Sequence, residues 1–286
     1  MKKYLLFFVM ATGLYACSSV PITGRQQLNL VSDSEVLALS LQEYNNYIKT
    51  AKKSTDKTAT APVEKVGRKI ADAVEAYFKA TNQEQLIAGY QWEFNLVDDP
   101  QVNAFCMPGG KIVVYTGILP YAKDETGLAV VLGHEVGHAI AKHANERMSH
   151  QMAVQYGDAA VDVLLSKSSS TVQSIGSVVY GLGTEVGVML PFNRKQELEA
   201  DRLGLILMAI AGYDPNAAIP FWERMSQQGN KGSVEFLSTH PSDNTRIADI
   251  QKELPEAMEY YEAVYGKKPT TTTPAGNSNP NNNWHF

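Results

Sequence analysis

His134-Glu135-Val136-Gly137-His138 stands in a stretch whose apolar residues recur at helical spacing. On a helix, residues four apart lie on one face with Cβ atoms about 5–6 Å apart, so both imidazoles can reach one zinc ion at about 2.0–2.1 Å. The alternative, two surface histidines on a helix, is weakened because their neighbours are apolar or glycine. The stretch therefore predicts a helix that presents His134 and His138 as zinc ligands.

Glu135 lies beside the two histidines. From there its carboxylate can accept a proton from the catalytic water rather than bind the metal itself, and we expect it to act as the general base. A motif this short arises by chance in roughly one chain of this length in a hundred. A third metal ligand is therefore needed to support the assignment.

A catalytic zinc site needs three protein ligands and an open position. The position of the third histidine of the metzincins holds Ala144, which excludes that subclass. Glu197 and Asp201 are four apart in a predicted helix and share a face. Glu197 as a ligand, with Asp201 as acceptor for a histidine N–H, would complete a site for one zinc ion per chain. The alternative is a solvated acidic helix face, which the histidine motif upstream makes less favourable.

The composition is that of a globular protein. The 286 residues are 44% hydrophobic and 19% charged, which is enough for one large core or two small ones. The formal net charge is −5, and no basic stripe interleaved with aromatic residues occurs. We therefore expect no nucleic-acid partner.

The first residues predict an export signal. Lys2 and Lys3 form a charged start, and the apolar core at 4–14 is too short to span a bilayer. The motif from Leu14 to Cys17 resembles a bacterial lipobox, in which cleavage precedes the cysteine and its thiol is acylated. We expect a lipid on Cys17 to hold the chain on a membrane; the alternative is an ordinary signal peptide followed by a chance cysteine.

A lipid on Cys17 would leave Cys106 as the remaining cysteine, so we expect no intramolecular disulfide. Ser18 and Ser19 follow the acylated position. In lipoproteins of Gram-negative bacteria, an uncharged residue there goes with sorting to the outer membrane. The expected location is therefore the periplasmic face of the outer membrane.

Helices and a small sheet are expected along the chain. Ser32 and Glu35 have the spacing of a capping box, which opens a helix to about Lys53. A second amphipathic helix, containing Val63 to Tyr77, follows a linker at about 54–61. Further helices are expected at about 124–153, 195–211 and 215–228, and strands at 92–96 and 112–115.

The motifs together resemble a known family. The histidine motif, with the segment from Glu197 through Asp201 to Gly204, is similar to the gluzincin family of CaaX prenyl endopeptidases and HtpX. Its soluble lipoprotein branch, which includes BepA and LoiP, is nearer. The sequence departs from HtpX in lacking transmembrane helices and from BepA in lacking a C-terminal repeat domain. Three further segments resemble this branch: residues 20–30, residues 103–110, and His240-Pro241 with Arg246.

The resemblance implies roles for these residues. It assigns zinc binding to His134, His138 and Glu197 and base catalysis to Glu135. Asp201 would lie around the ligands as a hydrogen-bond partner. It also places His240 and Arg246 over the metal, as further catalytic residues. His240 could stabilise the oxyanion or bind zinc as a fourth ligand that silences the enzyme. From the residues alone, a loop histidine that caps the helix after Pro241 is the better interpretation of His240.

The resemblance also implies a fold and a place for substrate. The fold would be α+β and mostly α, a minimal zincin core with a small β-sheet and the histidine motif on a helix. An edge strand near 103–116 should receive an extended peptide through main-chain hydrogen bonds. The expected substrate-binding residues are Asn103, Ala104, Phe105, Gly109 and Gly110.

The expected function is that of a zinc-dependent endopeptidase of the bacterial cell envelope. The resemblance suggests polypeptide substrates, namely misfolded or misassembled envelope proteins, and possible envelope assembly complexes as partners. One alternative is an envelope chaperone or assembly factor with a silenced zinc site. A hydrolase of non-peptide amides and a purely structural lipoprotein are the others.

Four segments are expected: a signal peptide at 1–16, a tether at 17–31, a zinc metallopeptidase domain at 32–266 and a disordered tail at 267–286. Residues 154–193 combine apolar character with many glycines, which suggests a mobile lid or, equally, a loosely packed helical hairpin. His143, His150 and His285 are expected at the surface.

Overall fold

The computed structural model describes residues 17–156, 193–229, 236–237, 240 and 244–266. The expected signal peptide, most of the expected lid and the expected tail therefore lie outside the described residues, as does His285. The chain divides into two compact units, of which the first comprises 1–50 with 139–190 and the second 51–138 with 191–286. Apart from Cys17, every site residue predicted from the sequence belongs to the second unit.

The described part of the first unit contains a short hairpin and two helices. β1 (Cys17–Ser19) pairs antiparallel with β2 (Gln26–Leu28). α2 (Asp33–Thr50) begins at the predicted capping box, where the Glu35 N–H lies 3.3 Å from Ser32 Oγ and the Ser32 N–H lies 3.2 Å from Glu35 Oε2. The second helix is α6 (His143–Tyr156).

Side chains tie the N-terminal segment of this unit to α6. Arg25 donates two hydrogen bonds, of 2.7 and 2.8 Å, to the carboxylate of Glu146. The backbone N–H of Leu30 donates to Ser149 Oγ at 2.8 Å. Residues 17–31, expected to be a tether, thus include a strand pair and specific contacts.

The single helix predicted over 124–153 is wrong. α5 (Glu125–Ile140) ends before Lys142, whose φ of 56° lies in the left-handed region, and α6 starts at the next residue. The sequence has no glycine or proline at this break. The helical periodicity therefore predicted a continuous helix across it. His143 follows the break and is fully buried, which corrects its expected surface position, whereas His150 is exposed as predicted.

In the second unit, α3 (Lys57–Ala80) buries the predicted apolar face, including Val63, Val66 and Ile70. Asp56 caps the helix by accepting hydrogen bonds from the backbone N–H groups of residues 58 and 59. The linker expected at 54–61 is therefore mostly helix. A 3₁₀ turn (Glu84–Leu86) follows.

The sheet of the second unit has three strands in the order β3-β5-β4. β3 (Glu93–Val97) runs parallel to the fully buried β5 (Lys111–Tyr115), and β4 (Ala104–Met107) pairs with β5 antiparallel. β4 is thus an edge strand, as predicted for this region. A 3₁₀ turn (Thr116–Ile118) and α4 (Leu119–Ala122) lead from β5 to α5.

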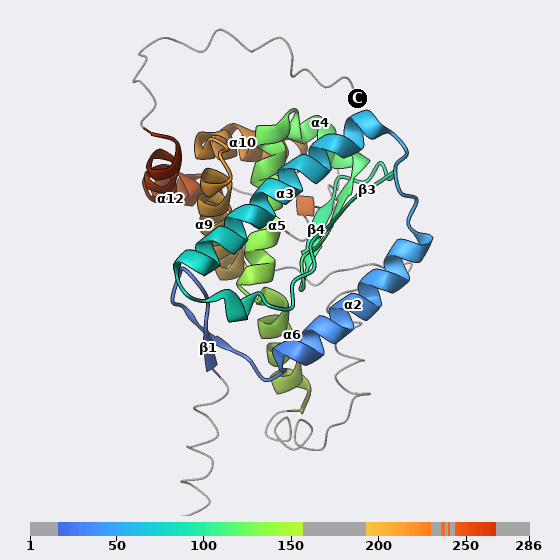
Figure 1. Ribbon diagram of the computed structural model, residues 1–286, viewed down its shortest axis with the longest axis vertical. Coiled ribbons are helices and arrows are strands. Elements are labelled where there is room, and N and C mark those ends of the chain that lie inside the picture. The colour runs from blue at the N-terminus through green and yellow to red at the C-terminus, as the bar shows by residue number, and fades with distance from the viewer. Residues whose placement is uncertain (1–16, 157–192, 230–235, 238–239, 241–243, 267–286) are drawn as a thin grey trace, which may run out of the picture. The chain divides into compact units, whose positions relative to one another are not determined.

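The last helices of the unit pack on one another (Figure 1). α9 (Arg194–Ile210) starts at a capping box formed by Asn193 and Gln196, and the chain leaves it through Gly212 at φ 89°. A 3₁₀ turn (Pro215–Ala217) leads into α10 (Ala218–Gly229). α12 (Asn244–Tyr265) packs along α9, joined by two hydrogen bonds from Arg202 to Glu256.

The described elements confirm an α+β fold that is mostly helical with small sheets. In the second unit, α3 packs on strand β3 and on α9. The backbones of α5 and α9 come into direct contact. No helix in the described part of the chain has the length and apolar character needed to cross a membrane.

Candidate metal centre

The helices that carry the predicted ligands, α5 and α9, meet backbone to backbone. A Cβ atom on Gly137 would lie 2.7 Å from the carbonyl oxygen of Ala200, and one on Gly204 would lie 2.7 Å from the backbone nitrogen of His134. Any larger residue at either position would push the helices apart. This close approach brings Glu197, on α9, to the histidines of α5.

Four buried side chains converge at this crossing. One ligand atom from each of His134, His138, Glu197 and His240 lies within 4.8 Å of the other three. His134 Nε2 lies 3.0 Å from His138 Nε2, and Glu197 Oε1 lies 3.3 Å from His138 Nε2. The fourth member, His240, has its Nδ1 3.2 Å from His134 Nε2 and 3.0 Å from Glu197 Oε1.

The spacing and chemistry of these atoms fit zinc. Ligands at about 2.0–2.1 Å from a tetrahedral zinc ion lie about 3.3–3.4 Å from one another, and the donor atoms here lie 3.0–3.3 Å apart. Two imidazoles and one carboxylate are a usual ligand set for catalytic zinc. His134, His138 and Glu197 therefore form the predicted zinc site.

Asp201 orients the ring of His134. Its Oδ1 lies 2.9 Å from His134 Nδ1, which leaves Nε2 to face the cluster. Burial and the charge of Arg246 lower the pKa of His134, so its imidazole is neutral and can bind a metal. Burial acts to raise the pKa of Asp201, but Arg246 and His134 hold it below its ordinary value, so this acceptor is ionised.

Both carboxylate oxygens of Glu197 lie near ligand nitrogens. Oε1 faces the ring nitrogens of His138 and His240. Oε2 lies 3.6 Å from His134 Nε2 and 3.1 Å from Arg246 Nη1, the latter in an ion pair without hydrogen-bond geometry. Burial acts to raise the pKa of Glu197, but His240 and His138 lower it far below the ordinary value, so the carboxylate is ionised and suited to a cation.

Glu135 lies beside the cluster. Its side chain is 3% exposed, and its Oε1 has no hydrogen-bond partner among the described residues and lies 3.6 Å from His240 Nε2. Burial raises the pKa of Glu135 to about 7, although His240 acts to lower it. The backbone N–H of Cys106, on β4, donates a hydrogen bond to this carboxylate. A buried carboxylate with such a pKa can take up and release a proton near neutral pH.

The two residues that the family resemblance placed over the metal differ in position. His240 lies in the cluster, and its Nδ1 is a potential fourth ligand. Arg246 lies behind the ligands instead. Its Nε and Nη2 donate to the two carboxylate oxygens of Asp201, each at 2.7 Å, and its Nη1 donates to the carbonyl oxygen of His240 at 3.3 Å.

The expected substrate-binding residues occupy β4 and the turn after it. Asn103 precedes the strand and accepts the backbone N–H of Ala104 through Oδ1 at 2.9 Å. Phe105 is buried and packs edge-on against the ring of Tyr115. Gly109 and Gly110 form the turn between β4 and β5, with φ of 91° and 83°. Of this region, β4 is the part that contacts the cluster, through the hydrogen bond from Cys106 to Glu135.

Sequence reasoning missed Trp222. The indole of this α10 residue meets the ring of His134 edge-on at a centroid distance of 5.6 Å and stacks on Phe236 at 5.9 Å. The guanidinium carbon of Arg246 lies 3.5 Å from the centroid of the indole. A tryptophan in an amphipathic helix resembles any other core residue, so no signal in the sequence set it apart.

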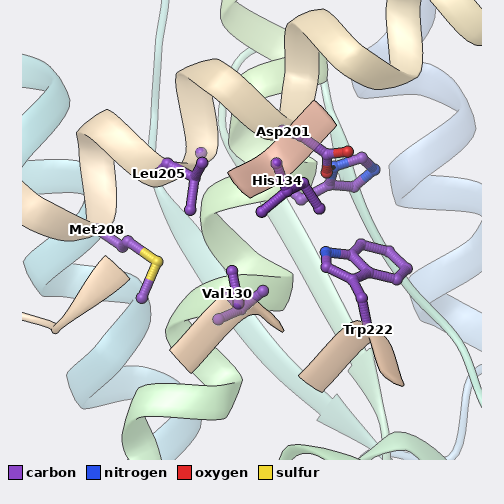
Figure 2. A pocket seen from close by; sticks show the side chains of 9 residues that line it. Val130, His134, Asp201, Leu205, Met208 and Trp222 are labelled. Carbon is purple, nitrogen blue, oxygen red and sulfur yellow. Dashed lines mark hydrogen bonds and ion pairs between the residues drawn. The ribbon is translucent and has the colours of Figure 1, made fainter. Parts of the chain in front are cut away.

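A small pocket, with a volume of about 10 Å³, lies behind His134 (Figure 2). Its polar wall is formed by His134 and Asp201, and Trp222 closes one side. The remaining wall is apolar and consists of Val130, Gly204, Leu205, Met208, Ala218 and Ile250. The pocket therefore borders the metal ligand on the side where Asp201 holds its ring.

Comparison with known proteins agrees with this site. Residues 60–254 match the model of Peptidase family M48, and this range contains both ligand helices. The chain is 43% identical to the mitochondrial metalloendopeptidase OMA1 of Schizosaccharomyces pombe over 170 residues, or 59% of the chain, and 32% identical to that of Saccharomyces cerevisiae over 279 residues, or 91%. It is also 31% identical to the β-barrel assembly-enhancing protease of Escherichia coli over 165 residues, or 56%.

These relatives differ in how much of their length is matched. The chain spans 48% of the S. pombe protein, 76% of the S. cerevisiae protein and 34% of the E. coli protein. The family match covers more than half of this chain and includes the histidine motif and Glu197. The chain therefore belongs to Peptidase family M48, with the zinc site of a metalloendopeptidase intact.

Proposed function

We propose that this chain is an endopeptidase of the bacterial cell envelope that hydrolyses peptide bonds of misfolded or misassembled proteins. The observation that carries the proposal is the position of Glu135, which lies beside the buried zinc ligands and is hydrogen-bonded to an edge strand. The relatives named as metalloendopeptidases and as a protease support the reaction class. The substrate class rests on the resemblance to the lipoprotein branch.

The residues of the site have separate roles in peptide hydrolysis. Zinc held by His134, His138 and Glu197 would polarise the scissile carbonyl and lower the pKa of a water molecule towards about 7. Glu135 accepts the proton of the attacking water and returns it to the leaving amine. Within the described part of the chain its Oε1 has no hydrogen-bond partner, which suits it to receive that proton.

β4 supplies a surface for an extended substrate. The N–H of Tyr115 donates to the carbonyl of Asn103, so the backbone of residues 103, 105 and 107 faces β5. The backbone of Ala104 and Cys106 consequently points to the open edge, where their N–H groups bind Asn103 Oδ1 and Glu135 and their carbonyl oxygens point the same way. A substrate strand that paired there would lie next to Glu135, and main-chain hydrogen bonds would bind it with little sequence preference.

Hydrolysis of casein, a poorly structured polypeptide, by the zinc-loaded chain is the direct test of this proposal. Zinc content is measured on the same samples, so that loss of activity and loss of metal are separated. Cleavage of a small amide without cleavage of casein would instead favour a hydrolase of non-peptide amides.

His240 is proposed to restrain the resting enzyme. A fourth imidazole closes the position that a catalytic zinc site keeps open, and His240 Nδ1 lies at ligand distance from His134 Nε2. We expect His240→Ala to raise basal casein hydrolysis while zinc stays bound. The matched control is His150→Ala, which removes an exposed histidine from α6.

A fall in rate would contradict this restraint. If His240 stabilises the oxyanion instead, the same variant should lower kcat by about 10² to 10³. The two roles thus change the rate in opposite directions, and one measurement at saturating zinc distinguishes them. An unchanged rate would leave His240 with neither role.

An envelope chaperone or assembly factor with a silenced zinc site is the second candidate function. The close approach of His240 to the zinc ligands favours it, because such a site is closed in this conformation. The E. coli relative is named for enhancing β-barrel assembly, although that name describes the E. coli protein. Persistence of the cellular role in a Glu135→Gln variant would support this candidate over the protease.

The chain is proposed to be anchored by a lipid on Cys17 at the periplasmic face of the outer membrane, with a peptidase domain at 32–266. The support is the lipobox-like motif, with Ser18 and Ser19 behind it. We expect mass spectrometry of the native protein to find acylated Cys17 at the N-terminus. An unmodified thiol or a different start would refute the anchor without touching the zinc site.

A further inference from the structure

The guanidinium of Arg246 is held on one face by an aromatic ring. Its central carbon lies 3.5 Å from the centroid of the Trp222 indole, well within the range of a cation–π contact. Both residues are buried, at 2% and 1% exposure, so little water competes for the charge. The contact therefore fixes the plane of the guanidinium as well as its position.

The guanidinium nitrogens of Arg246 contact oxygen atoms of residues next to the zinc ligands and of one ligand. Nε and Nη2 both bind Asp201, while Nη1 faces the carbonyl oxygen of His240 and Glu197 Oε2. Each nitrogen thus has a buried oxygen as neighbour within 3.3 Å. This arrangement directs Arg246 towards the ligands and leaves it poorly placed to contact a substrate oxyanion.

The contact with Glu197 affects how this residue can bind a metal. A carboxylate can bind zinc through one oxygen or through both, and Arg246 places a positive charge 3.1 Å from Oε2. Oε1 faces the ring nitrogens of His138 and His240. The charge on Arg246 therefore favours binding through Oε1 alone, which leaves room at the metal for water and substrate.

The indole of Trp222 is packed closely on several sides. The pocket that it borders has a volume of about 10 Å³, which is room for about one water molecule (Figure 2). The ring meets His134 edge-on at a centroid distance of 5.6 Å and stacks on Phe236 at 5.9 Å. The contact with Arg246 at 3.5 Å adds an attraction between the ring face and the cation.

We propose that Trp222 is a positioning residue of the zinc centre, which acts through Arg246 to keep Glu197 a one-oxygen ligand. The indole face orients the guanidinium, whose charge lies 3.1 Å from Oε2 and would make this oxygen the weaker donor to a zinc ion. The proposal rests on the zinc site and not on the proposed substrate. Its test measures metal binding without substrate, so its failure and that of the protease proposal are distinguishable.

The test compares two substitutions of Trp222 in the full chain, with Zn²⁺ as the probe. Trp222→Leu removes the aromatic face and should weaken zinc binding by about 10- to 100-fold. Losses of this size are usual when a residue that orients a metal ligand is replaced. Trp222→Phe keeps a smaller aromatic face and should lose less affinity than Trp222→Leu. Zinc affinity is measured by competition with a chelator of known affinity.

A second readout reports the ligand geometry itself. X-ray absorption of the zinc-loaded protein counts the nitrogen and oxygen atoms at about 2.0–2.2 Å from the metal. We expect one additional light ligand, a carboxylate oxygen, in Trp222→Leu and in Arg246→Ala, and an unchanged count in Trp222→Phe.

Phe78→Leu is the matched control, since it removes a buried aromatic from α3 that makes no described contact with the zinc ligands. It should lower thermal stability but leave zinc affinity unchanged. Wild-type zinc affinity and oxygen count in Trp222→Leu would overturn the proposal. An equal loss of affinity in Phe78→Leu, or in Trp222→Phe, would overturn it as well, because the effect would then not depend on the aromatic face.

Discussion

Glu135→Gln is expected to keep its zinc and to lose casein hydrolysis by a factor on the order of 10² to 10⁴, the usual contribution of a general base. Glutamine matches the shape of glutamate, and its amide oxygen can still accept the N–H of Cys106. It cannot accept a proton from water near neutral pH. Zinc content and the initial rate of casein hydrolysis, measured on one preparation, test the retained metal and the lost activity.

Glu199→Gln is the matched control for this variant. Glu199 is a buried carboxylate on α9 at 7% exposure, and it is the next candidate for the base if Glu135 is not. We expect Glu199→Gln to retain most of the activity. A wild-type rate in Glu135→Gln together with a large loss in Glu199→Gln would transfer the role to Glu199.

Glu197→Ala is expected to lose zinc, and with it all hydrolysis. The carboxylate is one of three ligands, so its removal should weaken zinc binding by more than the roughly 100-fold seen for outer partners. It also leaves the buried charge of Arg246 with one acidic partner fewer, since Asp201 remains. Metal analysis after dialysis against a weak chelator measures the loss.

Glu75→Ala serves as the control for Glu197→Ala, because it removes an exposed carboxylate from α3 in the same unit. It should bind zinc as the wild type does. Full zinc occupancy in Glu197→Ala would remove Glu197 from the site. In that event His240, whose Nδ1 lies 3.2 Å from His134 Nε2, would be the third ligand.

Local signals in the sequence predicted much of the fold. The capping box at Ser32 and the glycine stop at Gly212 mark a helix start and a helix end that the structure confirms. The break at Lys142 was not predictable in this way, because a left-handed lysine carries no signal in its residue type. The burial of His143 was missed for the same reason.

The sequence by itself determined the ligands on α5, since a four-residue spacing places His134 and His138 side by side on any helix. It also determined Glu197 once a third ligand was required. Only the tertiary structure decided the places of His240, Arg246 and Trp222. His240 lies 106 residues from His134 along the chain, and the packing of separate helices, rather than any local periodicity, brings such residues together. That packing turned Arg246 towards Asp201 and Glu197, and it put the ring of Trp222 against Arg246.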